Sequence, residues 1–145
     1  MKKESKYRGK DRSWEVWLQR AKSNLARAKQ GRQSEDILFE DLCFDAQQAA
    51  EKALKALLLY LNLDYPRTHS IGHLLSLIER RGKIPIPQEV REAVTLTDYA
   101  VTTRYPGDWD PVDEEEYAEA VRLAEATYNW VLEEIKKRSQ FHSLI

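Results

Sequence analysis

The sequence predicts an all-α protein, an up-and-down bundle of four long helices plus one short inserted helix. Apolar residues recur at helical spacing along most of the 145 residues, and no segment alternates convincingly as a strand does. Only five Gly and five Pro occur, which is typical of a regular chain. Short connections between amphipathic helices favour antiparallel neighbours. A chain of this length is expected to form one domain with its own core.

The first two helices are expected on either side of Gly31. Ser13 is a candidate N-cap for a helix that ends at Gly31. Its apolar face consists of Trp14, Trp17, Leu18, Ala21, Leu25 and Ala28. A second helix is expected after Ser34, running to about Asn62, with Leu38, Leu42, Ala46, Ala50, Ala53, Leu54, Leu57, Leu58 and Leu61 facing inward. Being the longest element, it should occupy the centre of the bundle.

Three more helices follow a break at Pro66, which disfavours helical geometry at the preceding residue. The short third helix carries Ile71, Leu74, Leu75 and Ile78 and stops at Gly82. The fourth begins near Pro87 and carries on one face Val90, Ala93, Val94, Thr97, Val101 and Arg104, with Arg104 at the edge of the buried part. The fifth opens at Asp113 and carries Tyr117, Ala120, Val121, Ala124, Tyr128, Val131 and Ile135. We expect the bundle to span residues 13–138, between tails at 1–12 and 139–145.

Charge is segregated along the chain although the formal net charge is only −1. Residues 1–12 carry six basic and two acidic side chains, and residues 108–119 carry seven acidic side chains and no basic one. These segments are typical of a flexible solvated tail and of an acid-rich helix start. Any affinity for nucleic acid must therefore come from a local basic patch rather than from bulk charge.

Several classes of protein are disfavoured by simple absences in the sequence. Cys43 is the single cysteine, so an intramolecular disulfide or a multi-cysteine metal site is excluded. No apolar run approaches the roughly 18 residues of a membrane span, and the basic N-terminal residues lack an apolar stretch behind them. Neither a phosphate-binding Gly-rich loop nor a nucleophile elbow is present. We expect a cytoplasmic protein with no membrane association and no cofactor.

Three segments together resemble one family. They are the run from Gln47 to Ala56, the helix start from Thr68 to Leu75, and the stretch from Asp98-Tyr99 to Arg104-Tyr105-Pro106. Across roughly residues 14–138 the chain resembles the HEPN domain, the higher eukaryotes and prokaryotes nucleotide-binding domain. The resemblance implies a helical bundle that is commonly dimeric and is often encoded beside a minimal nucleotidyltransferase, the pair acting as toxin and antitoxin.

The resemblance also implies a sequence motif by which ribonuclease members of the family can be recognised. Some relatives are metal-independent ribonucleases that use an Arg followed, after four to six residues, by a His at the start of the last long helix. Arg104 lies where that Arg is expected, but no His occurs between Tyr105 and Thr127. A literal Arg-x5-His does occur at Arg67 and His73, before the third helix. There Arg67 could hold a phosphate while His73 moves protons; alternatively, Thr68 or Ser70 caps the helix and His73 packs beside the core.

The remaining candidates are polar groups on or near the central helix. His69 and His73 are four residues apart, as metal ligands on a helix can be, but no third ligand has suitable local spacing, so no metal site is expected. Arg104 needs partners, which could be Glu51, Asp45, Asp98 or a phosphate. Tyr105, with Tyr99 and Trp109, could stack a base or fill gaps in the bundle.

Gln47, Gln48 and Glu51 could fix the register of a dimer or line a pocket that reads a base edge. The resemblance implies a nucleotide- or RNA-binding homodimer with a nucleotidyltransferase partner. Its ligand-binding candidates are Arg104, Tyr105, Glu51, Gln47, Asp98 and His69, and its catalytic candidates are His73 and Arg67. The alternatives are a metal-independent endoribonuclease and a non-catalytic helical interaction protein.

Overall fold

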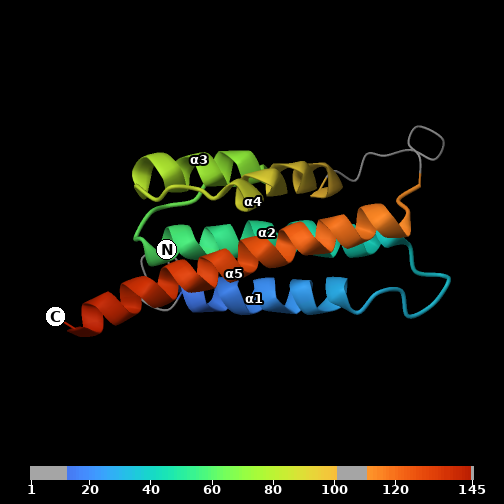
Figure 1. Ribbon diagram of the computed structural model, residues 1–145, viewed down its shortest axis with the longest axis horizontal. Helices are drawn as coiled ribbons and strands as arrows, with labels where there is room; N and C mark the ends of the chain where they lie inside the picture. Colours follow the sequence, from blue (N-terminus) through green and yellow to red (C-terminus); the bar gives the residue numbers. More distant parts are fainter. Residues whose placement is uncertain (1–12, 101–110, 145) are drawn as a thin grey trace, which may run out of the picture.

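The computed structural model describes the backbone of residues 13–100 and 111–144, and side chains as far as residue 139. Within these residues the protein is entirely helical, so the all-α prediction is confirmed. The elements are α1 (Ser13–Lys29), α2 (Phe39–Tyr60), α3 (Ile71–Arg81), α4 (Gln88–Arg91), the 3-10 helix η2 (Glu92–Ala100) and α5 (Glu114–Leu144). In Figure 1, α1, α2 and α5 run lengthwise beside one another, and α3 and α4 cover another side of α2.

Helix α2 lies at the centre because it contacts most of the other elements: α1, α3, η2 and α5. Its alanines are fully buried, and their small side chains allow neighbouring backbones to approach closely (Ala46, Ala49, Ala50, Ala53 and Ala56). Larger apolar residues fill the remaining space, with Leu54, Leu57 and Leu58 of α2 fully buried. The prediction of a central, alanine-lined helix is therefore confirmed.

The start of α2 differs from the prediction. The helix begins at Phe39 rather than after Ser34, because the Ser34 hydroxyl accepts a hydrogen bond from the Asp36 N–H and its carbonyl accepts one from Ile37, which closes a turn. Leu38 precedes the helix in an extended conformation. It is 56% exposed rather than inward-facing.

The predicted fourth helix is one turn of α-helix followed by nine residues of 3-10 helix. A 3-10 helix has about three residues per turn, so side chains three apart share a face. Val90, Ala93 and Leu96 are accordingly buried. Val94, which a period of 3.6 places on the buried face, is 44% exposed. The predicted end of this helix, with Val101 and Arg104, lies outside the described residues.

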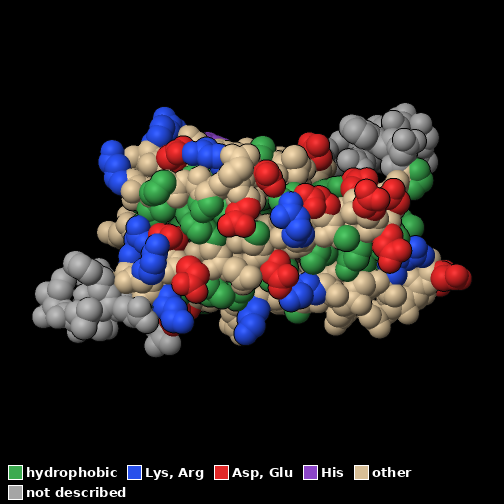
Figure 2. All heavy atoms as spheres, in the orientation of Figure 1, with side chains coloured by type: hydrophobic (Ala, Val, Ile, Leu, Met, Phe, Trp, Pro, Cys, Tyr) green, Lys and Arg blue, Asp and Glu red, His purple; other side chains and the backbone are tan. Residues whose placement is uncertain are grey.

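Helix α5 begins as expected next to Asp113, whose carboxylate accepts a hydrogen bond from the Glu116 N–H at 2.8 Å. Three glutamates follow in the first turn, where negative charge favours the helix dipole. Acidic side chains are prominent near this end of the molecule in Figure 2. The helix continues to Leu144. The domain boundary at residue 138 stays a prediction.

None of the described helices combines the length and the apolar character that a bilayer crossing requires. Cys43 is buried in the core. It therefore contributes to packing as a small apolar side chain.

Close packing around α2 predicts that its alanines cannot be enlarged. Ala50→Leu should lower the free energy of unfolding by about 1–3 kcal/mol, because the added atoms must displace packed neighbours. The matched control is Ala118→Leu, the same change at an exposed position of α5, which should leave stability within about 0.5 kcal/mol. Urea unfolding followed by circular dichroism measures both. Equal stability of the two variants would contradict this description of the core.

Candidate functional site on the polar face of α2

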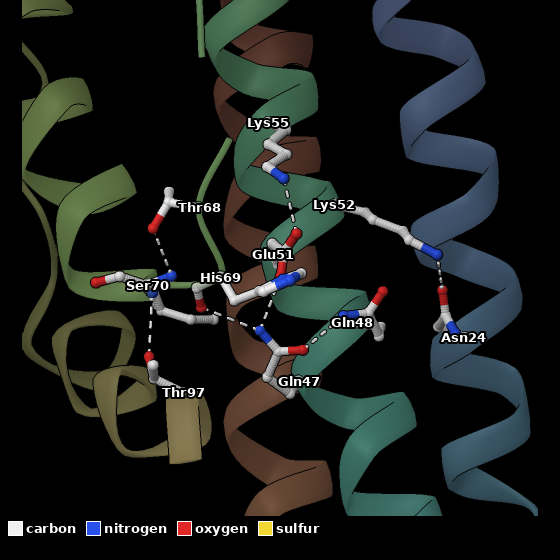
Figure 3. A network of polar contacts seen from close by, with 11 residues as sticks. Asn24, Gln47, Gln48, Glu51, Lys52, Lys55, Thr68, His69, Ser70 and Thr97 are labelled. Atoms are coloured by element: carbon white, nitrogen blue, oxygen red, sulfur yellow. Dashed lines mark hydrogen bonds and ion pairs between the residues drawn. The ribbon is translucent and has the colours of Figure 1, made fainter. Parts of the chain in front are cut away.

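A network of polar side chains lies along α2, beside the segment that precedes α3. We call it the Glu51 network, and it consists of Gln47, Gln48, Glu51, Lys55 and His69. Glu51 Oε1 accepts hydrogen bonds from Gln47 Nε2 and His69 Nδ1, both at 2.9 Å, and its Oε2 accepts one from Lys55 Nζ at 2.7 Å. Gln48 donates to Gln47 Oε1 at 2.8 Å. Figure 3 shows Glu51 surrounded by its donors.

Glu51 is a buried carboxylate whose partners keep it ionised. Its side chain is only 4% exposed. Burial by itself raises the pKa of Glu51, but the hydrogen bonds from Lys55, Gln47 and His69 together outweigh it, so the pKa lies below its ordinary value. Lys55, also buried, has its ammonium 5.6 Å from the ring centre of Trp17 and 5.3 Å from that of Tyr65. The aromatic faces add to the stabilisation of this cation.

His69 is held from both its backbone and its ring. Its carbonyl accepts from Gln47 Nε2 at 3.2 Å. The next residue, Ser70, caps α3 by accepting the His73 N–H, and the Ile71 N–H donates to Thr97 Oγ1 of η2 at 3.1 Å. Although its Nδ1 is anchored to Glu51, the side chain is 68% exposed. His69 Nε2 makes no hydrogen bond to any residue that the structure describes.

A second network, the Lys52 network, joins α2 to α1 and consists of Asn24, Arg27, Asp45 and Lys52. Lys52 Nζ donates to Asn24 Oδ1 at 2.8 Å, and Asn24 Nδ2 donates to Asp45 Oδ1 at 3.0 Å. Arg27 binds the same carboxylate through Nε at 3.3 Å and through Nη2 at 3.0 Å. Burial and the nearby positive charge of Arg20 lower the pKa of Lys52. Both networks include residues of α2, but Lys52 contacts α1 whereas Glu51 contacts the segment before α3.

The HEPN domain family matches residues 14–135 of this chain. The protein belongs to the HEPN domain family. Its structure is similar to that of TT1696 from Thermus thermophilus, with a TM-score of 0.72 and 33% identity over 86% of this chain and 98% of that one. It is also similar to ST0689, an archaeal HEPN homologue, with a TM-score of 0.66 and 29% identity over 84% of this chain and 97% of that one. A search of curated proteins gave no match.

This HEPN bundle brings together three of the residues predicted from the sequence, namely Gln47, Glu51 and His69. Ser70 is confirmed as the cap of α3, which was one of the two residues expected there. Arg67 and His73 are both exposed, and no hydrogen bond or ion pair joins them. Their catalytic role stays a prediction.

Among the described residues, the predicted Asp98 enters neither network. Asp98 is exposed on η2. Arg104 and Tyr105 lie outside the described residues, as does Trp109, so their ligand-binding role stays a prediction. Asp45, which was one expected partner of Arg104, is bound by Asn24 and Arg27.

Sequence reasoning missed part of the site. Lys55 had a detectable signal, since a Glu and a Lys four residues apart on a helix commonly pair. Asn24, Trp17 and Tyr65 had no such signal in the sequence. They contact α2 only because separate segments of the chain pack together, and the sequence does not show which of their residues come into contact. No group of three or more His, Cys, Asp or Glu side chains suited to a metal ion is found in the described part of the HEPN domain.

The Glu51–Lys55 pair predicts a large cost when only one charge is removed. Glu51→Gln should lower the free energy of unfolding at pH 7 by about 3–5 kcal/mol, because it leaves the buried Lys55 ammonium without a counter-charge. The double variant Glu51→Gln with Lys55→Met removes both charges and should recover most of that loss. Urea unfolding at pH 7 measures these differences. A Glu51→Gln variant as stable as the wild type would contradict the ion pair.

The same unfolding experiment has a pH dependence with a defined sign. Because the pKa of Glu51 is lower in the folded protein than in the unfolded chain, the carboxylate stabilises the fold at pH values above its ordinary value of 4.5. This contribution is lost as the pH falls through the folded pKa. The double variant lacks the carboxyl and should therefore lose less stability than the wild type between pH 5 and about pH 3.

Proposed function

We propose that this HEPN protein binds a nucleotide or RNA through the polar face of α2, with His69 as the principal phosphate contact. The observation that supports the proposal is the exposed His69 ring anchored by a buried carboxylate. Glu51 fixes the orientation of the ring through Nδ1. An imidazolium carries a proton on both ring nitrogens, and its second N–H can form a charge-assisted hydrogen bond with a phosphate oxygen.

The surroundings of His69 support the same proposal. Glu51 is already satisfied by three donors, so its negative charge is balanced inside the protein by Lys55 rather than directed at a ligand. Gln48, half-buried at the edge of the network, offers an amide suited to the polar edge of a base. The site therefore combines a phosphate donor with a group capable of hydrogen bonding to a base.

The biological setting that we propose comes from the family. HEPN proteins are commonly dimeric and are often encoded beside a minimal nucleotidyltransferase, so we propose a cytoplasmic homodimer that is one component of a two-gene module of the toxin–antitoxin type. The polar face of α2 is then the place where the nucleic-acid ligand of that module binds.

Binding to His69 can be tested with a matched histidine. His69→Ala should weaken binding of AMP or a short RNA about tenfold or more, because a charge-assisted hydrogen bond is lost. His73→Ala is the control, since His73 is also exposed and only its backbone N–H takes part in the cap of α3, by donating to the Ser70 hydroxyl. Isothermal titration calorimetry measures the affinities, and thermal melting establishes that both variants are folded.

The reverse result would overturn this assignment. Loss of binding in His73→Ala or Arg67→Ala, with His69→Ala unaffected, would place the ligand at the Arg67–His73 pair. RNA cleavage in the presence of a chelator that disappears in His73→Ala would favour the endoribonuclease. Variants that change only the affinity for a partner protein would favour the non-catalytic interaction protein.

The partner is tested separately from the ligand. A small nucleotidyltransferase should be encoded in the neighbouring reading frame, and when the two proteins are co-expressed it should co-purify with a tagged copy of this chain. The control is an unrelated nucleotidyltransferase expressed at the same level. A neighbouring frame of another kind, together with no co-purification, would count against the two-gene module while leaving ligand binding untouched.

A further inference from the structure

Lys52 is a half-buried lysine whose amine is held by a neutral group rather than by a carboxylate. Its Nζ donates to the amide oxygen of Asn24 at 2.8 Å and makes no ion pair with any residue that the structure describes. Figure 3 shows this side chain reaching from α2 to α1. Lys29, Lys55 and Lys137, by contrast, each pair with a glutamate. Lys52 therefore lacks the direct counter-charge that favours the protonated form of those amines.

Positive charge gathers around the Lys52 amine. Arg20, Asn24 and Arg27 share one face of α1 because they are four and three residues apart. Arg20 is exposed and makes no hydrogen bond or ion pair with the described part of the chain. Arg27 shares the carboxylate of Asp45 with Asn24. When Lys52 is protonated, three cations therefore accompany one carboxylate, and two positive charges are left over.

These surroundings favour the neutral form of the amine. Burial has the largest effect and lowers the pKa of Lys52, and the positive charge of Arg20 lowers it further. Glu51 and Asp45 act in the opposite direction, and Arg27 acts in the same direction as Arg20. The pKa of Lys52 thus lies below its ordinary value of 10.5. Near neutral pH a larger share of this amine is unprotonated, and hence nucleophilic, than in an exposed lysine.

Carbon dioxide is an electrophile that suits this amine. It is small and uncharged, so it reaches a half-buried group without a large pocket and without the loss of a hydration shell. The lone pair of neutral Nζ attacks the carbon, an N–C bond forms as one C=O electron pair moves onto oxygen, and a proton passes from nitrogen to water or bicarbonate. The product is a carbamate, which places one negative charge where the ammonium had one positive charge.

We propose that Lys52 is a site of reversible carboxylation by carbon dioxide, and that the charges of Arg20 and Arg27 stabilise the resulting carbamate. The carbamate balances the cluster, since two arginines then accompany two anions, Asp45 and the carbamate. The N–H that remains on the nitrogen still donates to Asn24. Acylation by another donor would remove the charge of Lys52 but would give the arginines no anion, so one positive charge would be left over. This inference does not depend on the proposed ligand site.

Labelled bicarbonate in sealed samples of the whole chain detects the modification. A carbamate signal, distinct from those of carbon dioxide and bicarbonate, should appear in the ¹³C NMR spectrum. Alkylation with triethyloxonium traps the carbamate as a stable ester, which mass spectrometry of peptides then locates. Lys52 should carry at least about fivefold more label than Lys22, an exposed lysine of α1, as expected from charge interactions of about 1 kcal/mol. Lys52→Arg keeps the positive charge but has no reactive amine, so its signal should be lost.

Charge variants test the stabilisation in both directions. Arg20→Gln should lower the occupancy of the Lys52 carbamate about two- to fivefold, because one stabilising cation is lost. Asp45→Asn should raise the occupancy, because a competing anion is removed. Lys22→Gln removes the same charge from α1 but lies about 200° around the helix from Arg20, and it should change nothing. Circular dichroism melting establishes folding, and Arg20→Gln, which alters an exposed side chain, decides the test by itself if Asp45→Asn is unfolded.

Three results would overturn this inference. The first is a folded wild-type protein with no label on Lys52 in a solution saturated with carbon dioxide. The second is equal labelling of Lys52 and Lys22, which would reduce the reaction to the general reactivity of amines. The third is an occupancy that Arg20→Gln leaves unchanged. None of these results bears on nucleotide binding, which His69→Ala tests separately.

Discussion

The arrangement of this HEPN bundle depends on the hydrogen bonds and the ion pair made by one buried carboxylate, that of Glu51. It lies on the central helix, and its three donors come from two parts of the chain: Gln47 and Lys55 from α2, and His69 from the segment before α3. A charge at this depth is tolerated only when it is fully paired. The carboxylate therefore fixes the path by which the chain leaves α2 and starts α3, and through Ser70 and Ile71 it also fixes the contact with η2.

The same helix carries the core and the candidate site on different sides. Its alanines and leucines are buried against α1, α3, η2 and α5, whereas the Glu51 and Lys52 networks follow its polar side. Residues on a helix keep their relative positions as long as the helix does not shift. Dense packing on the apolar side therefore determines the geometry on the polar side.

The sequence was sufficient for the fold class and for the central position of α2, and its local spacing limited the cap of α3 to Thr68 or Ser70. The prediction that Leu38 and Val94 are buried was wrong, because both rested on a regular α-helix assumed from apolar periodicity. A turn at Ser34 delays the start of α2 past Leu38, and η2 has 3-10 geometry at Val94. Glu51 and Gln47 could be singled out as polar residues on an apolar helix. The contacts of Asn24 with Lys52 and Asp45 could not, because they depend on which residues of two antiparallel helices come into register.

The immobilised polar side chains around Glu51 have a consequence for the entropy of ligand binding. Its ammonium is already immobilised by Glu51 and by the rings of Trp17 and Tyr65, and the imidazole of His69 is likewise restrained before any ligand arrives. Ordering a long side chain on binding costs about 0.5–1.5 kcal/mol each. For the proposed contact at His69, most of that penalty is thus met during folding rather than when the site is occupied.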